Sequence, residues 1–265
     1  MRESSILVSR IFLNKVINVK KLLLMSIITI LGIKTTDISF AAEDTYSAVY
    51  NDKEWYELKG SLKDSEITLS VIDNICYIKI NEFGKNAYEE LNNIVEHNND
   101  KDRIIIDLRN NSGGYIDEAA NCAAIFIDKD TVFMKIVYDS GDEKIFCGNN
   151  ADEVTKKIVI LVNSKTASSS EAFALSLKKN GALLIGEKTY GKNSIQRLTK
   201  EKVGGIKNTV GKYEIFGMDF SENGTEPDIV IHNESTIVYD DRKYIVKETD
   251  NQLNKAIELL KEAVI

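Results

Sequence analysis

Residues Arg103–Ile127 read RIIIDLRNNSGGYIDEAANCAAIFI, and this stretch has the pattern of a strand, a turn and a helix in succession. The continuous apolar run in Arg103–Leu108 is typical of a strand that is buried on both faces of a sheet. The polar and glycine-rich segment Asn110–Gly114 ends this strand, and the alanine-rich segment Ile116–Ile127 is predicted to be a helix. A strand followed by a helix in this way is half of a parallel βαβ unit.

The same order of elements returns further along the chain. Lys157–Asn163 (KIVILVN) is a second apolar run of this kind, and a turn rich in serine and threonine follows it. Ser168–Lys179 is then predicted to be a helix, and Ala182–Gly186 a short strand. The alternation of strands and helices predicts an α/β fold built from parallel βαβ units.

Elements on either side of these units extend the predicted fold. Ile67–Ile72 and Ile75–Ile80 alternate as two strands, and Asp73-Asn74 between them favours a hairpin turn. Apolar residues at helical spacing predict a helix over Ala87–Asn98. Further predicted elements are strands at Thr131–Tyr138 and Lys144–Cys147, a β-rich segment at 194–216 and an amphipathic helix at Asn251–Val264.

The N-terminus has the order of a secretory signal. Five basic residues precede Leu22, twelve mostly apolar residues occupy Leu22–Ile33, and small residues follow at Ala41-Ala42. A membrane-spanning helix needs about 20 residues, so this apolar run is short for one. We expect 1–41 to be the cleaved signal peptide of an exported bacterial protein, secreted or associated with the cell envelope, with an uncleaved membrane anchor as the alternative. Residues 42–66 are then a short N-terminal arm or helix, and 67–265 form the main domain.

The composition argues against several classes of function. The chain has 265 residues, 43% of them hydrophobic, and a formal net charge of −7 at pH 7, so it lacks the basic character of a nucleic-acid-binding protein. Its two histidines and three cysteines match no zinc or disulfide pattern. No glycine loop with the spacing of a phosphate-binding motif follows a strand. We therefore expect no metal and no organic cofactor.

Chemistry is expected where the two buried strands end, because sites in α/β folds form beyond the carboxyl ends of strands. Gly113 and Gly114 follow the first strand. Paired glycines present bare main-chain N–H groups, which can stabilise a developing oxyanion. The alternative is a tight turn that serves only to reverse the chain.

The second strand end carries the sequence NSKTASSSE at Asn163–Glu171. Serine and threonine are common caps at a helix start, and that is the alternative interpretation of this segment. A serine at a helix N-terminus is also well placed as a nucleophile, because the helix dipole stabilises negative charge. The residues alone do not choose among Ser168, Ser169 and Ser170.

A serine nucleophile needs a base that takes its proton. His97 ends a predicted surface helix and His232 lies beyond a predicted strand, so neither fits the strand ends well. Lys192, within GEKTYGKNSIQ at Gly186–Gln196, can serve if burial lowers its pKa toward neutral, since desolvation disfavours the charged form. The usual alternative for a lysine is a solvated surface charge.

Four ordered segments resemble the carboxyl-terminal processing proteases, also called tail-specific proteases, which are serine peptidases with a Ser/Lys pair. DLRNNSGG is similar to the DLRNNPGG segment of that family, and NSKTASSSEAFALSL with GEKTYGKNSIQ is similar to its TASASE and lysine segments. The two remaining segments are ICYIKINEFGKNAYEELNNIV at the start of the core, and NGTEPDIVI with DNQLNKAIELL at its end.

The resemblance implies a ClpP/crotonase-like core of βαβ units with an additional β-rich segment and a C-terminal helix. It implies Ser168 as the nucleophile, Lys192 as the general base and Gln196 as the residue that supports the lysine. The main-chain N–H groups of Gly114 and Ser169 are implied as the oxyanion donors. A protein or peptide is the implied substrate, and no metal or cofactor is implied.

The chain departs from the family pattern in several places. Ser169 replaces the usual alanine, Ser112 a proline and Asn193 a glycine. Many members carry a PDZ domain that captures substrate C-termini. Only about 25 residues separate the expected signal from the first core strand, and a domain needs about 50, so we expect no PDZ domain. The alternative functions are a non-catalytic relative that binds peptide or ligand, and an acyl-CoA enzyme of related architecture.

Overall fold

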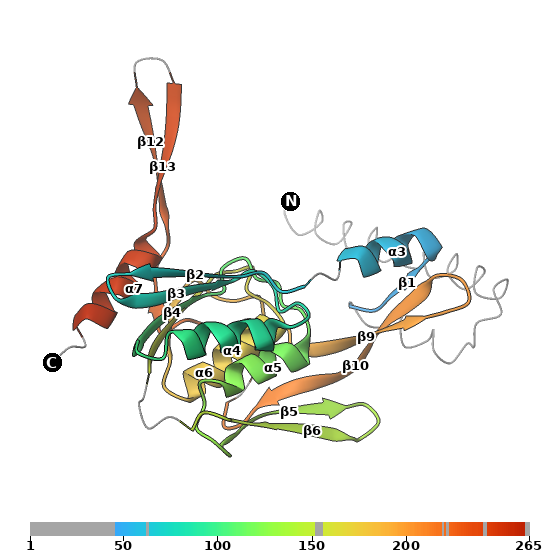
Figure 1. Cartoon of the computed structure of the whole chain (residues 1–265). Helices are drawn as coiled ribbons and strands as arrows, with labels where there is room; N and C mark the ends of the chain where they lie inside the picture. The colour runs from blue at the N-terminus through green and yellow to red at the C-terminus, as the bar shows by residue number, and fades with distance from the viewer. Residues whose placement is uncertain are drawn as a thin grey trace, which may run out of the picture. The chain divides into compact units, whose positions relative to one another are not determined.

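A six-stranded sheet lies at the centre of the main part of the chain in this computed structural model (Figure 1). Its strands are β2 (Ile67–Ile72), β3 (Ile75–Ile80), β4 (Arg103–Asp107), β7 (Lys157–Val162), β8 (Leu183–Gly186) and β11 (Ile229–Val230). The order is β11-β8-β7-β4-β3-β2, and all neighbouring pairs are parallel except β2 with β3. The prediction of an α/β fold with parallel βαβ units is confirmed.

The structure describes residues 46–61, 64–151, 156–218, 220, 223–240 and 243–262. The chain divides into two compact units, which are Met1–Ser61 with Gln196–Thr209, and Leu62–Ile195 with Val210–Ile265. Gln196–Thr209, which we expected within the domain 67–265, thus groups with the N-terminal arm. The expected signal peptide, 1–41, lies outside the described residues. Among the helices that the structure describes, none is both long and apolar enough to cross a membrane.

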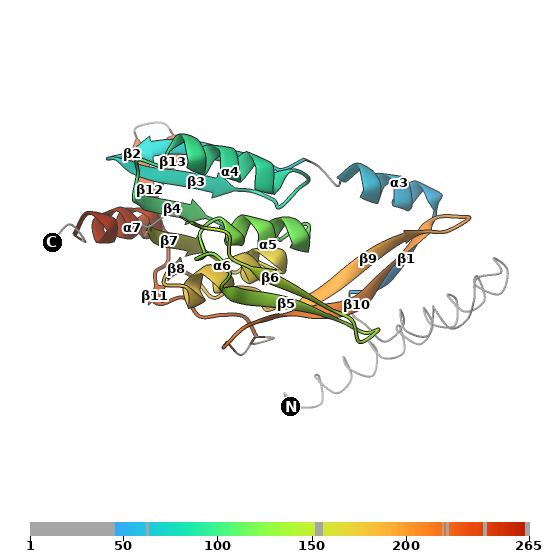
Figure 2. The same cartoon turned by 60° about the horizontal axis from the view of Figure 1, so that its bottom comes forward.

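Helices cover both faces of the central sheet (Figure 2). One face packs against α4 (Ala87–His97), α5 (Ile116–Ala124) and α6 (Ser169–Lys179), and the other against α7 (Asn251–Glu262). Residues Ile104–Asp107 of β4 are consequently all buried. This double covering is what the uninterrupted apolar run in β4 predicted.

Helix α5 ends at Ala124, earlier than the predicted end at Ile127. The carbonyl oxygens of Ala124 and Ile127 accept hydrogen bonds of 3.0 Å from the main-chain N–H groups of Asn149 and Asn150. In a longer helix these oxygens would accept bonds from residues four positions further on. The chain instead continues as a tighter turn, in which Phe126 N and Ile127 N donate to carbonyl oxygens three residues earlier.

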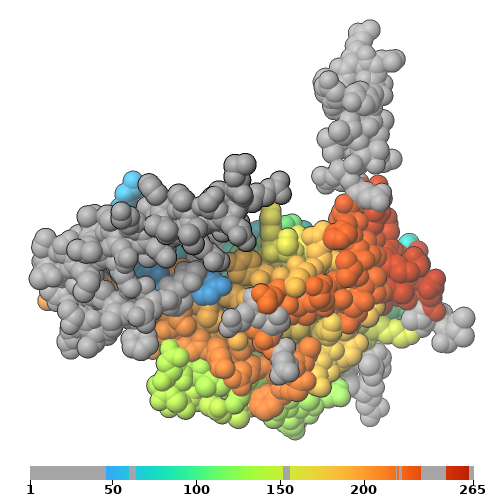
Figure 3. Space-filling model, turned by 180° about the vertical axis from the view of Figure 1, so that it is seen from behind, coloured from blue at the N-terminus to red at the C-terminus, as the bar shows by residue number. Residues whose placement is uncertain are grey.

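A second, antiparallel set of strands contains the additional β-rich segment. It consists of β5 (Val132–Tyr138), β6 (Glu143–Cys147) and the C-terminal half of β10 (Gly205–Ile215). β10 pairs with β5 so that Tyr213 lies opposite Ile136. The chain then returns to the central sheet at β11, and Lys178 Nζ lies 2.7 Å from Asp228 Oδ1 beside it. In Figure 3 the orange residues of this return lie beside the yellow residues of the segment from β7 to β8.

The smaller unit is built from β1 (Ala48–Tyr50), α3 (Asp52–Ser61) and parts of β9 (Ser194–Lys200) and β10. β1 pairs antiparallel with Gly205–Lys207 of β10. Asp52 Oδ1 accepts hydrogen bonds from Lys200 Nζ at 2.8 Å and from Gly204 N at 2.7 Å. The short helix expected in the arm is present, and β1 is an element that the sequence analysis did not predict.

A two-stranded hairpin follows β11 and was also not predicted. It consists of β12 (Glu234–Asp240) and β13 (Lys243–Thr249), which pair antiparallel. Their register runs from Glu234 opposite Thr249 to Asp240 opposite Lys243. The hairpin forms a sheet of its own, and α7 follows it directly.

Candidate active site

The turn after β7 presents Ser168 at the start of α6. Ser168 has φ 59° and ψ −124°, a conformation that costs a residue with a side chain about 1–3 kcal/mol. Ser168 is partly exposed, whereas Ser169 and Ser170 are only 1% and 0% exposed. The turn therefore brings one of the three consecutive serines to the surface. A strained serine between a strand and a helix is the geometry of an exposed nucleophile.

The turn after β4 is shaped by glycines and by one buried asparagine. Gly113 and Gly114 have φ of 117° and 137°. Asn111 is fully buried, and its Oδ1 accepts a hydrogen bond of 2.9 Å from Gly113 N. Gly113 O in turn accepts a bond of 3.0 Å from Phe83 N, and Tyr115 N donates to Phe83 O at 2.8 Å. The peptide groups on both sides of Gly114 are thus fixed.

The two turns are in direct contact. Ala167 N donates a hydrogen bond of 3.1 Å to Asn111 O. A Cβ atom added to Gly113 would lie 3.1 Å from Ser168 Cβ, which shows how closely the glycine turn approaches the serine. Further bonds run from Thr166 Oγ1 to Leu108 O (2.9 Å) and from Asn110 N to Asn163 Oδ1 (3.0 Å). Asn110 and Asn163 also line a cavity of about 230 Å³ at this edge of the sheet.

Two main-chain N–H groups at this contact have no acceptor among the described residues. Among the described residues, neither Gly114 N nor Ser169 N donates a hydrogen bond. For Ser169 this follows from its place in the first turn of α6, where N–H groups have no partner within the helix. Main-chain donors of this kind can stabilise an oxyanion.

A buried carboxylate joins the serine turn to the loop that carries Lys192. Glu171 is fully buried, and its Oε2 accepts hydrogen bonds of 2.9 Å from both Ser168 N and Lys192 N. Its Oε1 accepts bonds from Thr189 Oγ1 at 2.6 Å and from Gly191 N at 2.8 Å. The main chains of Ser168 and Lys192 are thus held against one carboxyl group, and the side chain of Lys192 starts close to the serine.

Sequence reasoning missed Asn111 and Glu171 as residues of this site. Glu171 had a visible signal, because an acidic residue three positions after a helix cap is the pattern of a capping box. That pattern explains its bond to Ser168 N, but not its bond to Lys192 N. Asn111 precedes Ser112 and the two glycines, where asparagine side chains often bond to the main chain two residues further on.

Gln196 belongs to a different compact unit from Ser168, Glu171 and Lys192. It lies on β9 and groups with the smaller unit. Its Nε2 donates a hydrogen bond of 3.2 Å to Thr209 Oγ1 on β10. The expected role of Gln196 as a support for the lysine therefore stays a prediction.

Both histidines are exposed and have partners of their own. His97 Nδ1 lies 2.7 Å from Asn93 O at the end of α4. His232 Nδ1 lies 3.0 Å from the carboxylate of Glu187. These surroundings are typical of surface histidines and support the choice of a lysine as the base.

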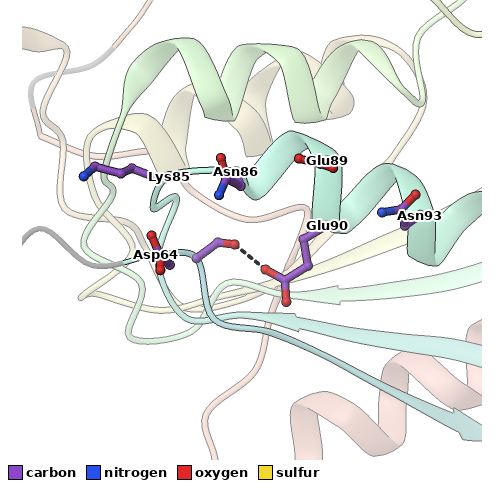
Figure 4. A pocket seen from close by; sticks show the side chains of 7 residues that line it. Asp64, Lys85, Asn86, Glu89, Glu90 and Asn93 are labelled. Carbon is purple, nitrogen blue, oxygen red and sulfur yellow. Dashed lines mark hydrogen bonds between the residues drawn. The ribbon is translucent and has the colours of Figure 1, made fainter.

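A separate pocket of about 320 Å³ lies at the start of α4 (Figure 4). The carboxylates of Asp64, Glu89 and Glu90 line it together with Lys85, and Ser65 Oγ donates a hydrogen bond to Glu90. Within the described part of the chain, no group of three or more His, Cys, Asp or Glu side chains could hold a metal ion. The acidic pocket is therefore not a candidate metal site.

Comparison with known protein families gives a match over most of the central sheet. Peptidase family S41 matches residues 74–231, which is more than half of the chain. The matched region contains both strand-end turns and the loop of Lys192.

Among curated relatives, the carboxyl-terminal-processing protease of Picosynechococcus sp. is 37% identical over 198 residues, which are 71% of this chain and 45% of that protein. A probable CtpA-like serine protease of Staphylococcus haemolyticus is 32% identical over 206 residues, covering 74% of this chain and 42% of that protein. The chain thus spans less than half the length of these relatives.

Solved structures with the same fold include the photosystem II D1 C-terminal processing protease. It has a TM-score of 0.53 and 26% identity, covering 64% of this chain and 48% of that one. A lipoprotein from Streptococcus agalactiae gives a TM-score of 0.59 over 84% of this chain and 78% of that one. At 20% identity, the second similarity shows the fold alone.

Proposed function

Because the chain belongs to peptidase family S41, a family of serine peptidases, we propose that it is an endopeptidase that cleaves proteins or peptides through an acyl-enzyme on Ser168. One observation carries this proposal. The carboxylate of Glu171 bonds to the main chains of both Ser168 and Lys192, next to the unpartnered N–H groups of Gly114 and Ser169. Acyl transfer to a serine requires a nucleophile, a base close to it and donors for the oxyanion, and this arrangement supports all three roles.

In the first half of the reaction, the neutral amine of Lys192 takes the proton from Ser168 Oγ as this oxygen attacks the peptide carbonyl carbon. The N–H groups of Gly114 and Ser169 stabilise the oxyanion that forms. The lysine ammonium group then gives its proton to the leaving amine, and the acyl-enzyme remains. Gln196 is proposed to orient the ammonium group during this step.

In the second half, Lys192 takes a proton from a water molecule as this water attacks the ester carbonyl carbon. The same two N–H groups stabilise the second oxyanion. The proton returns to Ser168 Oγ as the carboxylic acid product leaves. The proposal uses neither a metal ion nor an organic cofactor.

The experiment is labelling of the purified protein with a fluorophosphonate, which reacts with activated serines, together with hydrolysis of unfolded protein substrates. Ser168→Ala is expected to abolish labelling and to lower hydrolysis by at least about 10³-fold. Ser170→Ala is the matched control, because Ser170 is fully buried and its hydroxyl has no partner in the described residues. Full labelling and hydrolysis in Ser168→Ala would show that the nucleophile is wrong. Peptide binding without either activity in the wild type would favour the non-catalytic alternative.

We also propose that the protein is exported and that 1–41 is removed as a signal peptide, since the N-terminus has the basic, apolar and small-residue order of such a signal. The mature chain is then expected to begin at Ala42 or Glu43. N-terminal sequencing of the protein from its native host tests this expectation. An intact Met1 on membrane-bound material would instead identify an uncleaved anchor.

A further inference from the structure

Tyr213 is a buried residue of β10 that reaches the candidate active site. It is 1% exposed, and its ring packs edge-on against Phe220 with 5.5 Å between the ring centroids. Its main-chain N donates a hydrogen bond of 3.1 Å to Asn193 O, directly after Lys192. Pairing with Ile136 of β5 fixes the strand on its other side. The position of the phenol is therefore set by packing and by main-chain bonds.

The Tyr213 hydroxyl group contacts both proposed reacting residues. It lies 3.0 Å from Ser168 O and 3.1 Å from Lys192 O, and it donates to these two carbonyl oxygens as a shared hydrogen bond. Ser168 and Lys192 belong to different turns and are otherwise joined through the carboxylate of Glu171. The carboxylate accepts from their N–H groups and the phenol donates to their carbonyl groups, so each residue is bonded on both sides.

The phenol of Tyr213 keeps its proton, and so remains a hydrogen-bond donor, at neutral pH. Burial raises the pKa of Tyr213 well above its ordinary value, and the negative charge of Glu171 adds to this effect. A phenol in this state keeps its proton at neutral and moderately alkaline pH. The bond to the two carbonyl oxygens is thus not interrupted by ionisation.

We propose that Tyr213 is a positioning residue for the reaction, because its hydroxyl group fixes the distance between the main chains of Ser168 and Lys192. The inference rests on the proposed function and adds to it a residue that touches neither substrate nor the reacting atoms. Proton transfer from serine to lysine depends on alignment, and a misplacement of about 1 Å can slow a reaction about 100-fold, so loosening one side of this contact slows the chemical step. Substrate binding does not use the phenol and is unaffected.

The test is Tyr213→Phe, which removes the hydroxyl group and keeps the ring. We expect kcat to fall about tenfold with KM unchanged, as for the loss of one hydrogen bond that acts on the chemical step. The rate of fluorophosphonate labelling is expected to fall by the same factor. Hydrogen exchange at the amides of 191–193 is expected to become faster, and this measurement does not depend on activity.

Tyr77→Phe is the matched control, because its hydroxyl group also makes a hydrogen bond, of 2.6 Å to Asp107, away from Ser168. Unchanged kcat and labelling in Tyr213→Phe, or equal losses in Tyr77→Phe, would overturn the inference while the proposed function stands. A wild type as inactive as Ser168→Ala would overturn the proposed function, and the positioning role with it. Unchanged exchange at 191–193 would contradict the contact between the turns.

Discussion

The two turns of the candidate site reach unusual main-chain conformations in different ways. After β4, Gly113 and Gly114 adopt φ of 117° and 137°, which glycine does without a side-chain penalty. After β7, Ser168 adopts φ 59° although it carries a side chain. Two hydrogen bonds stabilise this second conformation: Ser168 N donates to the Glu171 carboxylate, and the Tyr213 hydroxyl donates to Ser168 O. The first turn is thus specified by residue type, and the second by partners that the fold brings to it.

The two turns are therefore expected to be sensitive to different kinds of substitution. The glycine turn should be broken by added atoms, because main-chain groups already occupy the space beside it. The serine turn should be broken by lost hydrogen bonds, because its strain is offset by its partners. Substitutions that separate steric effects from hydrogen-bond effects therefore test the comparison.

The largest effect is expected for Gly114→Ala. A Cβ atom at this position would lie 2.2 Å from Phe83 O, so the turn must shift and move its N–H group away from the proposed oxyanion position. We expect kcat/KM for peptide hydrolysis to fall about 10³-fold, as on loss of an oxyanion donor. Gly141→Ala is the control, because Gly141 has φ 89° with no atom within 4 Å of an added Cβ. Gly141→Ala should lose about 1 kcal/mol of stability and no activity. Equal activity in both variants would contradict the steric account.

A smaller effect is expected for Glu171→Gln at the serine turn. The amide group replaces one acceptor oxygen by a donor, so two of the four hydrogen bonds to this side chain are lost. We expect kcat/KM to fall about 100-fold and the free energy of unfolding to fall by about 2 kcal/mol. Glu118→Gln is the control, since Glu118 accepts one bond, from Tyr88 N, and glutamine retains one acceptor oxygen. If Glu171→Gln stays fully active, partners do not maintain the serine turn.

The stability of the central sheet should depend on pH through Asp107, the last residue of β4. This buried carboxylate accepts bonds from Arg109 Nη2 at 2.7 Å and from Tyr77 Oη at 2.6 Å. Burial acts to raise the pKa of Asp107, but the bonds and charge of Arg109 outweigh it and keep the pKa below its ordinary value. A lowered pKa in the folded state means that the interaction stabilises the protein above about pH 4 and is lost as the pH falls further.

We therefore expect Asp107→Asn to lower the free energy of unfolding by about 2 kcal/mol at pH 7. This loss is smaller than for breaking an isolated buried ion pair, because Arg109 still forms its ion pair with Asp250. Urea unfolding at pH 7 and at pH 3 should show that this difference from the wild type shrinks in acid. Asp117→Asn, which removes an exposed ion pair with Lys144, should change stability by less than about 1 kcal/mol. If this difference in the free energy of unfolding instead grows in acid, the pKa of Asp107 is not lowered in the folded protein.

The smallest effect is expected for Ser169→Ala. In the described residues the buried Ser169 hydroxyl has no hydrogen-bond partner, and the proposed mechanism uses only its N–H group. Removing an unsatisfied buried hydroxyl should leave the stability unchanged or raise it by up to about 1 kcal/mol. Activity should stay within about threefold of the wild type. If Ser169→Ala loses as much activity as Glu171→Gln, the Ser169 hydroxyl takes part in the reaction or in holding the serine turn.

Local patterns in the sequence were sufficient to predict the main strands of the central sheet. The apolar runs of β4 and β7 and the Asp73-Asn74 turn predicted strands and a hairpin that the structure confirms, with φ of 49° and 66° at the two turn residues. The resemblance to carboxyl-terminal processing proteases is confirmed by the match to peptidase family S41. The predicted end of α5 at Ile127 was wrong, because the helix ends at Ala124 and the next residues form a tighter turn with bonds to carbonyl oxygens three residues earlier.

The sequence by itself determined that polar turns follow β4 and β7, and it predicted that these turns lie together, because the carboxyl ends of parallel strands share one edge of a sheet. It did not choose among the three serines without a family resemblance. Exposure of Ser168 and burial of Ser169 and Ser170 were decided by the packing of α6 against the sheet. The bond from Tyr213 to Ser168 joins residues 45 positions apart, and no local periodicity encodes it. Such contacts exist only after the strands pair, which is why the tertiary structure alone reveals them.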